Sequence, residues 1–385
     1  MSVTAPAGFQ AAGVAAGIKP TGALDLALVV NDGPRHTAAG VFTTNKVKAA
    51  PVLWSQQVLQ ERSLHAVVLN SGGANACTGP EGFQDTHATA EKVGEVLGVG
   101  AIDVAVCSTG LIGERLPMPA VVSGVDGAAA ALDGTADAGT AAATAVLTTD
   151  SKAKQATAAG NGFSIGGFAK GAGMLAPNMA TMLSVLTTDA VVEPDVLDTA
   201  LRAATRTTFD RLDVDGGTST NDTVLVLASG ASGVEPSAEE LTEVLTAIST
   251  DLVRQLQGDA EGATKAVDIT VRGARTEDDA VHIGRIIAED NLVKTALFGS
   301  DPNWGRIAMA LGRAQAEIDV SRVEIITNGV SLFAGGLPNR DRGEADLTGR
   351  DIEIVVDLHL GDHAATILST DLSHDYVEEN SAYSS

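Results

Sequence analysis

The segment that decides the fold lies near the middle of the chain, where residues 170–183 read KGAGMLAPNMATML. Pro177 and Asn178 are a turn signal, and Met182 begins an apolar run that is typical of a buried strand. Thr181 therefore stands between a turn and a strand. A β-branched threonine also suits a strand for packing reasons alone, so the local pattern by itself fits a turn that feeds the sheet and has no chemical role.

Strands and helices are expected on both sides of this segment, without strict alternation. The predicted strands cover residues 24–28, 66–69, 104–107, 182–186, 223–227 and 352–360, with a hairpin across 160–173. The predicted helices cover residues 84–97, 128–146, 194–208, 237–256 and 277–297. This mixture favours an α+β fold, a layered α/β sandwich, over a doubly wound parallel sheet. No internal repeat, linker or domain boundary stands out.

The composition favours small-molecule chemistry. The 385 residues include 49 Asp and Glu against 25 Lys and Arg, a formal net charge of -24, and only 3% are aromatic. An acidic surface repels nucleic acid and anionic membranes, and base-stacking platforms need aromatic rings. Two cysteines cannot form a disulfide framework, which fits a reducing cytoplasm. No targeting segment and no apolar run of about 20 residues is apparent, so no membrane span is expected.

Several motifs resemble known sites but lack the spacing that the chemistry needs. Residues 258–265 have the wrong glycine and lysine spacing for a phosphate loop. Residues 213–216 resemble a calcium loop, but Arg211 stands where the first carboxylate must coordinate. The acidic and histidine residues within 357–363 fit a solvated strand face and a turn. No metal site is therefore expected, and no Gly-x-Ser-x-Gly motif supplies a serine nucleophile.

Five further motifs accompany the central segment in a fixed order along the chain. They are residues 70–79 (NSGGANACTG), 108–110 (STG), 147–150 (LTTD), 215–222 (DGGTSTND) and 299–306 (GSDPNWGR). Together with ATML at 180–183, they resemble the ornithine acetyltransferase family, also called glutamate N-acetyltransferase, across essentially the whole chain. The resemblance implies the layered sandwich of that family, self-cleaved between Ala180 and Thr181 into an α chain, residues 1–180, and a β chain, residues 181–385.

Self-cleavage gives a chemical role to Thr181. A threonine hydroxyl is a poor nucleophile, and a free α-amine on the same residue is one of the known ways to activate it. The amine has an ordinary pKa of about 7.7 to 8.0, so part of it is neutral near pH 7 and can accept the hydroxyl proton. The resemblance implies that Thr181 is the nucleophile and that the Thr109 hydroxyl and the Gly110 backbone N–H form the oxyanion hole.

The resemblance also implies a set of substrate contacts. These are Thr148, Lys170, Thr181, Glu261, Asn380 and Ser385. Lys170 suits a carboxylate and Glu261 suits an ammonium group, as amino-acid substrates require. Taken singly, each residue is more typical of a solvated surface. Asn380 and Ser385 would require an ordered C-terminal tail, which is unusual for a chain end.

The expected reaction passes acetyl from N2-acetyl-L-ornithine to L-glutamate through an acetyl-threonine intermediate, as a step of arginine biosynthesis. No cofactor is expected, although some family members also use acetyl-CoA as the donor. The expected assembly is a heterotetramer of two α and two β chains in the cytoplasm, without nucleic-acid or membrane partners. Two alternatives stay open: an amidase or aminopeptidase with an N-terminal nucleophile, which passes the acyl group to water, and an acidic metabolite-binding protein that is never cleaved.

Overall fold

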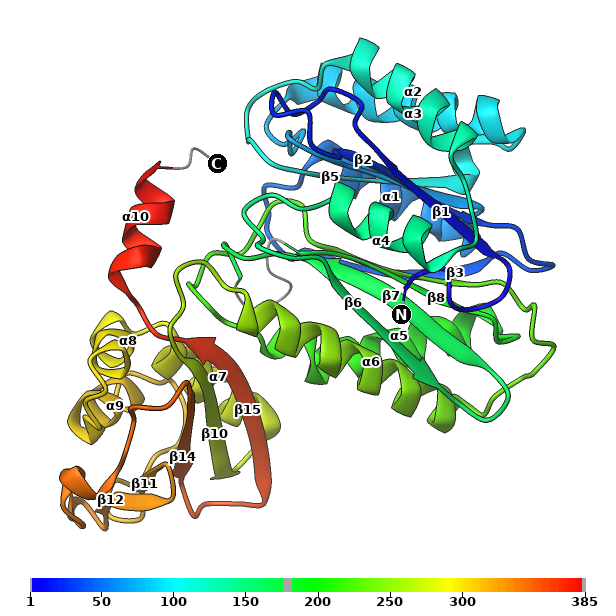
Figure 1. The fold of residues 1–385 in the computed structure, drawn as a ribbon. Helices are drawn as coiled ribbons and strands as arrows, with labels where there is room; N and C mark the ends of the chain where they lie inside the picture. The colour runs from blue at the N-terminus through cyan, green and yellow to red at the C-terminus, as the bar shows by residue number, and fades with distance from the viewer. Residues whose placement is uncertain (1, 176–181, 383–385) are drawn as a thin grey trace.

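The computed structural model describes residues 2–175 and 182–382, which form a larger layered α+β body and a smaller C-terminal unit (Figure 1). Two sheets face each other in the larger body. The first has the order β1-β2-β4-β5, with β1 Phe9–Val14, β2 Leu26–Asn31, β4 Ala66–Ser71 and β5 Val104–Thr109. The second has the order β3-β9-β8-β7-β6, with β3 Thr37–Phe42, β9 Thr223–Ala228, β8 Leu183–Thr188, β7 Ser164–Lys170 and β6 Lys154–Ala159.

Helices cover the outer faces of both sheets. On the first sheet lie α2 Gly79–Leu97 and α3 Met118–Ala130, and on the second lie α5 Pro194–Thr207 and α6 Ala238–Gly258 (Figure 1). Two more helices pack against the first sheet. Helix α1 Ala50–Val58 contacts β5, and helix α4 Ala136–Ala145 contacts β1 and β2. Every residue of β2, β4, β5, β8 and β9 is buried. Strands that are covered on both faces read as continuous apolar runs, which explains their Val- and Leu-rich sequences.

The second sheet combines strands from both sides of position 181. Its outer strands β3, β6 and β7 precede that position, whereas β8 and β9 follow it. β8 pairs with β7 in antiparallel fashion and with β9 in parallel fashion, and β9 pairs with β3. The two strands that follow position 181 are therefore held between strands that precede it.

The C-terminal unit is a six-stranded sheet of order β13-β12-β11-β14-β10-β15 with helices on one side. The strands are β10 Ala266–Ala274, β11 Glu324–Thr327, β12 Val330–Ala334, β13 Leu337–Pro338, β14 Asp351–Asp357 and β15 His363–Thr370. The helices beside the sheet are α7 Glu277–Ala288, α8 Asn291–Phe298 and α9 Trp304–Leu311, whereas α10 His374–Ala382 projects away from the sheet (Figure 1). Short 3-10 helices lie at Leu59–Glu61, Ala101–Asp103, Phe209–Arg211 and Arg342–Glu344.

The layered α+β prediction is confirmed, but two helix predictions are wrong. The helix expected over 128–146 is two helices, α3 and α4, and a new helix begins where the Thr135 hydroxyl accepts the N–H of Ala138. The helix expected over 277–297 is divided in the same way by Asp290, whose carboxylate accepts the N–H groups of Leu292 and Val293. Both caps are short polar side chains, which end one helix and start the next.

The separate C-terminal sheet also differs from the sequence analysis, which found no boundary. Only residues 259–265 connect α6 to β10, and this connection has no Pro- or Ser-rich linker. The division into residues 1–180 and 181–385 stays a prediction, because positions 176–181 lie outside the described residues. No helix in the described part of the chain is long and apolar enough to cross a membrane.

Candidate active site

The predicted oxyanion residues and the predicted lysine meet at the ends of two strands from different sheets. Thr109 is the last residue of β5, and Lys170 is the last residue of β7. Lys170 is 1% exposed, and its Nζ lies 3.1 Å from Oγ1 of Thr109 and 2.9 Å from Oγ1 of Thr148. Thr148 comes from the loop between α4 and β6. The structure therefore brings together three of the predicted site residues.

The direction of these hydrogen bonds defines what the Thr109 hydroxyl can do. An ammonium group is only a donor, so the hydroxyl oxygen of Thr109 accepts from Lys170. Its own hydrogen stays available for another acceptor. A positively charged donor also polarises the hydroxyl and strengthens the hydrogen bond that it gives. The pair is thus suited to stabilise a developing oxyanion.

The backbone of Gly110 is oriented for the same task. The carbonyl oxygen of Thr109 accepts the N–H of Gly73 at 3.0 Å. In a trans peptide the N–H points away from the carbonyl, so the Gly110 N–H is directed away from Gly73. Gly110 has φ +129°, and a Cβ there would lie 2.6 Å from the nitrogen of Gly73. Only glycine fits this conformation and this close approach.

A buried charge network lies behind the lysine. Oδ1 of Asp150 accepts the N–H of Gly171 and the ammonium of Lys154, both at 2.6 Å. Lys154 is fully buried and also donates to Oδ2 of Asp259 at 2.6 Å. Buried ions need such partners, because leaving one unpaired costs several kcal/mol. The network fixes the loop that carries Thr148 against the strand end that carries Lys170.

The pKa values of the two central groups move in the same direction for different reasons. Burial lowers the pKa of Lys170, and the nearby Asp150 carboxylate opposes this effect. Burial would raise the pKa of Asp150, but Lys170, Lys154 and the Gly171 N–H outweigh it and leave the pKa below its usual value. Asp150 is therefore ionised at neutral pH and helps to keep Lys170 protonated.

Glu261 and Asn380 form a second cluster, which links the C-terminal helix to the larger body. Nδ2 of Asn380 donates to Oε2 of Glu261 at 2.9 Å. The N–H of Glu261 donates to the carbonyl of Ala172 at 3.0 Å, and a Cβ at Gly173 would lie 2.2 Å from its carboxylate. Glu261 thus contacts the loop that follows Lys170. The chain forms helix α10 over His374–Ala382, and the expected role of the tail in substrate binding stays a prediction.

The remaining predicted residues, Ala180, Thr181 and Ser385, lie outside the described residues. Met182 and Leu183, which follow Thr181 in the sequence, are among the described residues. Leu183 pairs with Lys170 across β7 and β8, and the N–H of Met182 donates to Oδ1 of Asp222 at 2.9 Å. The start of β8 therefore lies at the same end of the sheet as Lys170.

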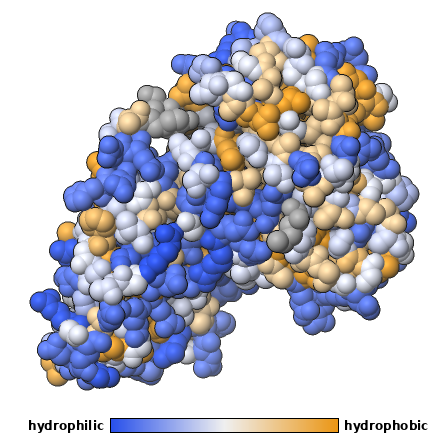
Figure 2. All heavy atoms as spheres, in the orientation of Figure 1, coloured by the Kyte–Doolittle hydropathy of each residue, from blue (hydrophilic) through white to orange (hydrophobic). Residues whose placement is uncertain are grey.

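One face of the molecule is largely hydrophilic (Figure 2). Figure 2 shows hydrophilic side chains over much of the C-terminal unit and its junction with the larger body, and a hollow beside α10. Such a face suits charged substrates better than apolar ones. Among the described residues, no group of three His, Cys, Asp or Glu is placed to hold a metal ion.

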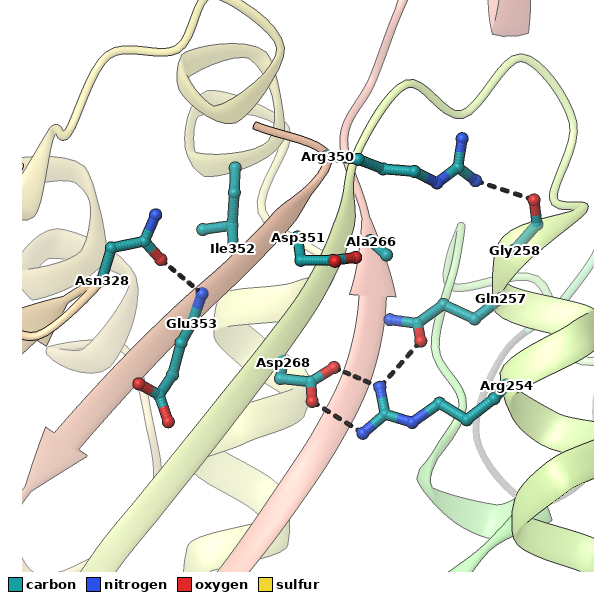
Figure 3. A pocket seen from close by; sticks show the side chains of 10 residues that line it. All are labelled: Arg254, Gln257, Gly258, Ala266, Asp268, Asn328, Arg350, Asp351, Ile352 and Glu353. Atoms are coloured by element: carbon teal, nitrogen blue, oxygen red, sulfur yellow. Dashed lines mark hydrogen bonds and ion pairs between the residues drawn. The ribbon is translucent and has the colours of Figure 1, made fainter. Parts of the chain in front are cut away.

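A separate cavity of about 440 Å³ lies between the end of α6 and strands β10 and β14 (Figure 3). Its two arginines are already engaged: Arg254 forms an ion pair with Asp268, and Arg350 donates to the carbonyl of Gly258. Its lining residues are not those of the predicted site. The predicted site residues at the strand ends therefore lie outside this cavity.

The sequence analysis missed the residues that support the site. Asp150 and Asp222 stand inside motifs that carried the family resemblance, but no role was assigned to them, and Lys154 and Asp259 were not singled out. A signal was present for Lys154 alone, because a lysine four residues after an aspartate at the start of a strand can form a local ion pair. The partner Asp259 is 105 residues away and only the fold reveals it.

Comparison with known proteins identifies the family of the chain. The model of the ArgJ family matches residues 10–385. The chain is 60% identical over 389 residues to the arginine biosynthesis bifunctional protein ArgJ of Mycolicibacterium paratuberculosis, covering 100% of this chain and 96% of that protein. The protein of the same name from Thermobifida fusca is 56% identical over 384 residues, with 100% of both chains covered.

A solved structure of ornithine acetyltransferase from Mycobacterium tuberculosis, in complex with ornithine, is 62% identical. It covers 46% of this chain and 94% of its own, with a TM-score of 0.45. The family model matches almost all of the sequence, and the two ArgJ relatives are 60% and 56% identical over 100% of this chain. These matches establish the family. This chain belongs to the ArgJ family.

Proposed function

We propose that this chain is a glutamate N-acetyltransferase that moves acetyl from N2-acetyl-L-ornithine to L-glutamate in arginine biosynthesis. The observation that carries the proposal is the pair of oxyanion donors: the Thr109 hydroxyl, polarised by Lys170, and the outward-directed N–H of Gly110. Full-length relatives named as arginine biosynthesis bifunctional proteins support it. The Thr109 hydroxyl and the Gly110 N–H suit acyl transfer that does not use a histidine.

The first half-reaction forms an ester on Thr181. The Thr181 oxygen attacks the acetyl carbonyl while its proton passes to the α-amine of the same residue. The carbonyl oxygen becomes an oxyanion, to which Thr109 and Gly110 donate. The C–N bond then breaks, the amine returns the proton to the leaving nitrogen, and ornithine departs.

The second half-reaction reverses these steps with a different amine. The neutral α-amine of glutamate attacks the acetyl ester, the same two donors hold the oxyanion, and the C–O bond to Thr181 breaks. The nitrogen loses a proton as the threonine oxygen regains one, which releases N-acetyl-L-glutamate. Among the described residues, the Lys170 ammonium donates to Thr109 and Thr148. An ammonium group carries three donors and suits a substrate carboxylate, whereas Glu261 suits an ammonium group.

The mature form is also part of the proposal. Cleavage between Ala180 and Thr181 supplies the amine, and the α chain, 1–180, and β chain, 181–385, then assemble in pairs as a heterotetramer. Ser385 joins Asn380 among the substrate contacts, acetyl-CoA serves as an additional donor, and no cofactor takes part. An acidic chain with two unpaired cysteines is consistent with action in the cytoplasm.

The test is a product assay with purified protein. Incubation with N2-acetyl-L-ornithine should yield N-acetyl-L-glutamate and ornithine only when glutamate is present. Release of acetate at the same rate without glutamate would identify the amidase alternative. Binding of both amino acids with no turnover, by a chain that stays intact in denaturing mass analysis, would identify a binding protein.

A further inference from the structure

Asn221 is a buried amide that joins the two halves of the site. It is 4% exposed and precedes β9. Its Nδ2 donates to the carbonyl oxygens of Ala74 at 2.6 Å and Ser108 at 2.8 Å, and its Oδ1 accepts the hydroxyl of Thr220 at 2.6 Å. Both amide hydrogens are therefore used: one binds the backbone of β5, and the other binds the backbone of the loop that follows β4.

The two carbonyl groups that Asn221 holds lie on either side of the oxyanion loop. The carbonyl of Ser108 belongs to the peptide that leads into Thr109. The carbonyl of Ala74 follows Gly73, whose N–H holds the carbonyl of Thr109. Because the Gly110 N–H takes its direction from the Thr109 carbonyl, a shift of either strand end would redirect it.

The residue after Asn221 holds the other half of the site. Oδ1 of Asp222 accepts the N–H of Met182, the residue that follows Thr181 in the sequence. The Cα atoms of adjacent residues are about 3.8 Å apart, so a single peptide unit separates the contact with the oxyanion loop from the contact with the start of β8. The planar peptide unit between Asn221 and Asp222 therefore limits how far these two contacts can move relative to each other.

We propose that Asn221 is a positioning residue for acetyl transfer, which fixes the Thr109 and Gly110 donors relative to the start of β8. The inference rests on the proposed function, because it requires that these donors stabilise an oxyanion. Oxyanion donors act only when they meet the charge that develops in the transition state. A displacement of about 1 Å can lower the rate by roughly 100-fold.

The main test is Asn221→Asp, which keeps the shape of the side chain and replaces two N–H donors by an oxygen facing two carbonyl oxygens. We expect kcat to fall roughly 100-fold, with little change in KM for N2-acetyl-L-ornithine. Both half-reactions should slow by a similar factor, since each passes through an oxyanion. A change in KM alone, or in one half-reaction alone, would overturn the inference.

Gln257, near the end of α6, offers a matched control because it binds backbone of the C-terminal unit. It is 2% exposed, and its Nε2 also donates to two carbonyl oxygens, those of Val267 at 3.2 Å and Ser369 at 3.0 Å. Gln257→Glu should therefore lower the melting temperature as Asn221→Asp does but leave kcat unchanged. An equal loss of kcat in both variants would mean that Asn221 acts only through stability.

The milder Asn221→Ser covers the case in which Asn221→Asp does not fold, and the same criteria apply to it. If a folded Asn221 variant is not cleaved, its activity cannot be measured and Thr109→Ala is used for comparison. A Thr109→Ala chain that also stays uncleaved supports the inference. Normal cleavage of Thr109→Ala overturns it. A wild-type protein that makes no N-acetyl-L-glutamate would instead contradict the proposed function, which keeps the two failures apart.

Discussion

Thr109 and Lys170 end strands of different sheets, yet Nζ of the lysine lies 3.1 Å from Oγ1 of the threonine. The contact crosses the interface between the two sheets, so the stacking of the sheets brings these two predicted site residues together. Burial lowers the pKa of the lysine, and the Asp150 carboxylate opposes this effect and favours the protonated form. Removal of this charge should therefore affect catalysis more than folding.

The first prediction concerns Lys170→Met. Loss of the ammonium removes the polarising donor, and we expect kcat to fall about 100-fold, the size of effect seen when one oxyanion donor is lost. Steady-state assays with a fixed amount of cleaved protein would measure it. Lys265→Met is the control, because that buried lysine donates only to the carbonyls of residues 347–349. A loss of kcat in the control as large as in Lys170→Met would contradict the prediction.

The second prediction is a pH dependence. Burial lowers the pKa of Lys170 below the ordinary value of 10.5, so the active protonated form is lost as the pH rises through that lowered pKa. The rate of the wild type should therefore decline on the alkaline side before pH 10.5 is reached. Lys170→Arg, which stays protonated, should be slower but lack this decline. The measurement is a pH profile of kcat/KM for the wild type and Lys170→Arg. An identical alkaline decline in both proteins would mean that a group other than Lys170 causes it.

The third prediction compares two glycines with positive φ. Gly110→Ala places a Cβ 2.6 Å from the nitrogen of Gly73, which must shift the oxyanion loop, and kcat should fall about 100-fold. Gly113 also has positive φ, at +89°, but a Cβ there meets nothing within 4 Å. Gly113→Ala should thus cost about 1 kcal/mol of stability and keep most of the activity. Chemical denaturation and kcat measurements separate the two effects, and equal activities would refute the proposed role of Gly110.

The fourth prediction concerns cleavage. Denaturing mass analysis of the wild type should show two chains, residues 1–180 and 181–385. Thr181→Ala has no hydroxyl and should give one intact chain without activity, whereas Thr181→Ser should be cleaved and retain some activity. Turnover by an intact Thr181→Ala chain would exclude Thr181 as the nucleophile.

The fifth prediction concerns a lysine outside the site. Burial lowers the pKa of Lys294 to about 8, although Asp213, Asp215 and Asp371 oppose it. Between pH 8 and the unfolded value of 10.5, the unfolded chain binds more protons than the folded one. The free energy of unfolding should therefore increase with pH in this range. Lys294 contributes at most about 1.4 kcal/mol per pH unit to this increase. Denaturant titrations at several pH values should show a smaller slope for Lys294→Met, and equal slopes would contradict the assignment.

The sequence predicted the layered α+β class because long buried strands and amphipathic helices have strong periodic signals. It placed β4, β5, β8 and β9 within a few residues. Helix ends were harder, since Thr135 and Asp290 are short polar residues that occur both as caps and on helix surfaces. Tertiary contacts, and not local propensity, decide whether such a residue caps a helix or lies on its surface.

The site was predicted only in part, for a related reason. Thr109, Gly110 and Lys170 stand in short motifs, and their roles came from a family resemblance. Asn221 carries no local signal of its role, because the carbonyls that it binds are 147 and 113 residues away in the sequence. Contacts of this kind become visible only when the two sheets are stacked.

The interleaved second sheet has a consequence for how the mature protein is made and lost. Strands β8 and β9 lie between β3 and β7, so cleavage before Thr181 would leave both pieces held by the same ladders. Each piece alone would lack the neighbours of its strands, and reassembly after denaturation would be a bimolecular reaction that slows on dilution. Folding would thus be a one-time event that precedes the cut, and the lifetime of the active enzyme would depend on its unfolding rate and not on an equilibrium.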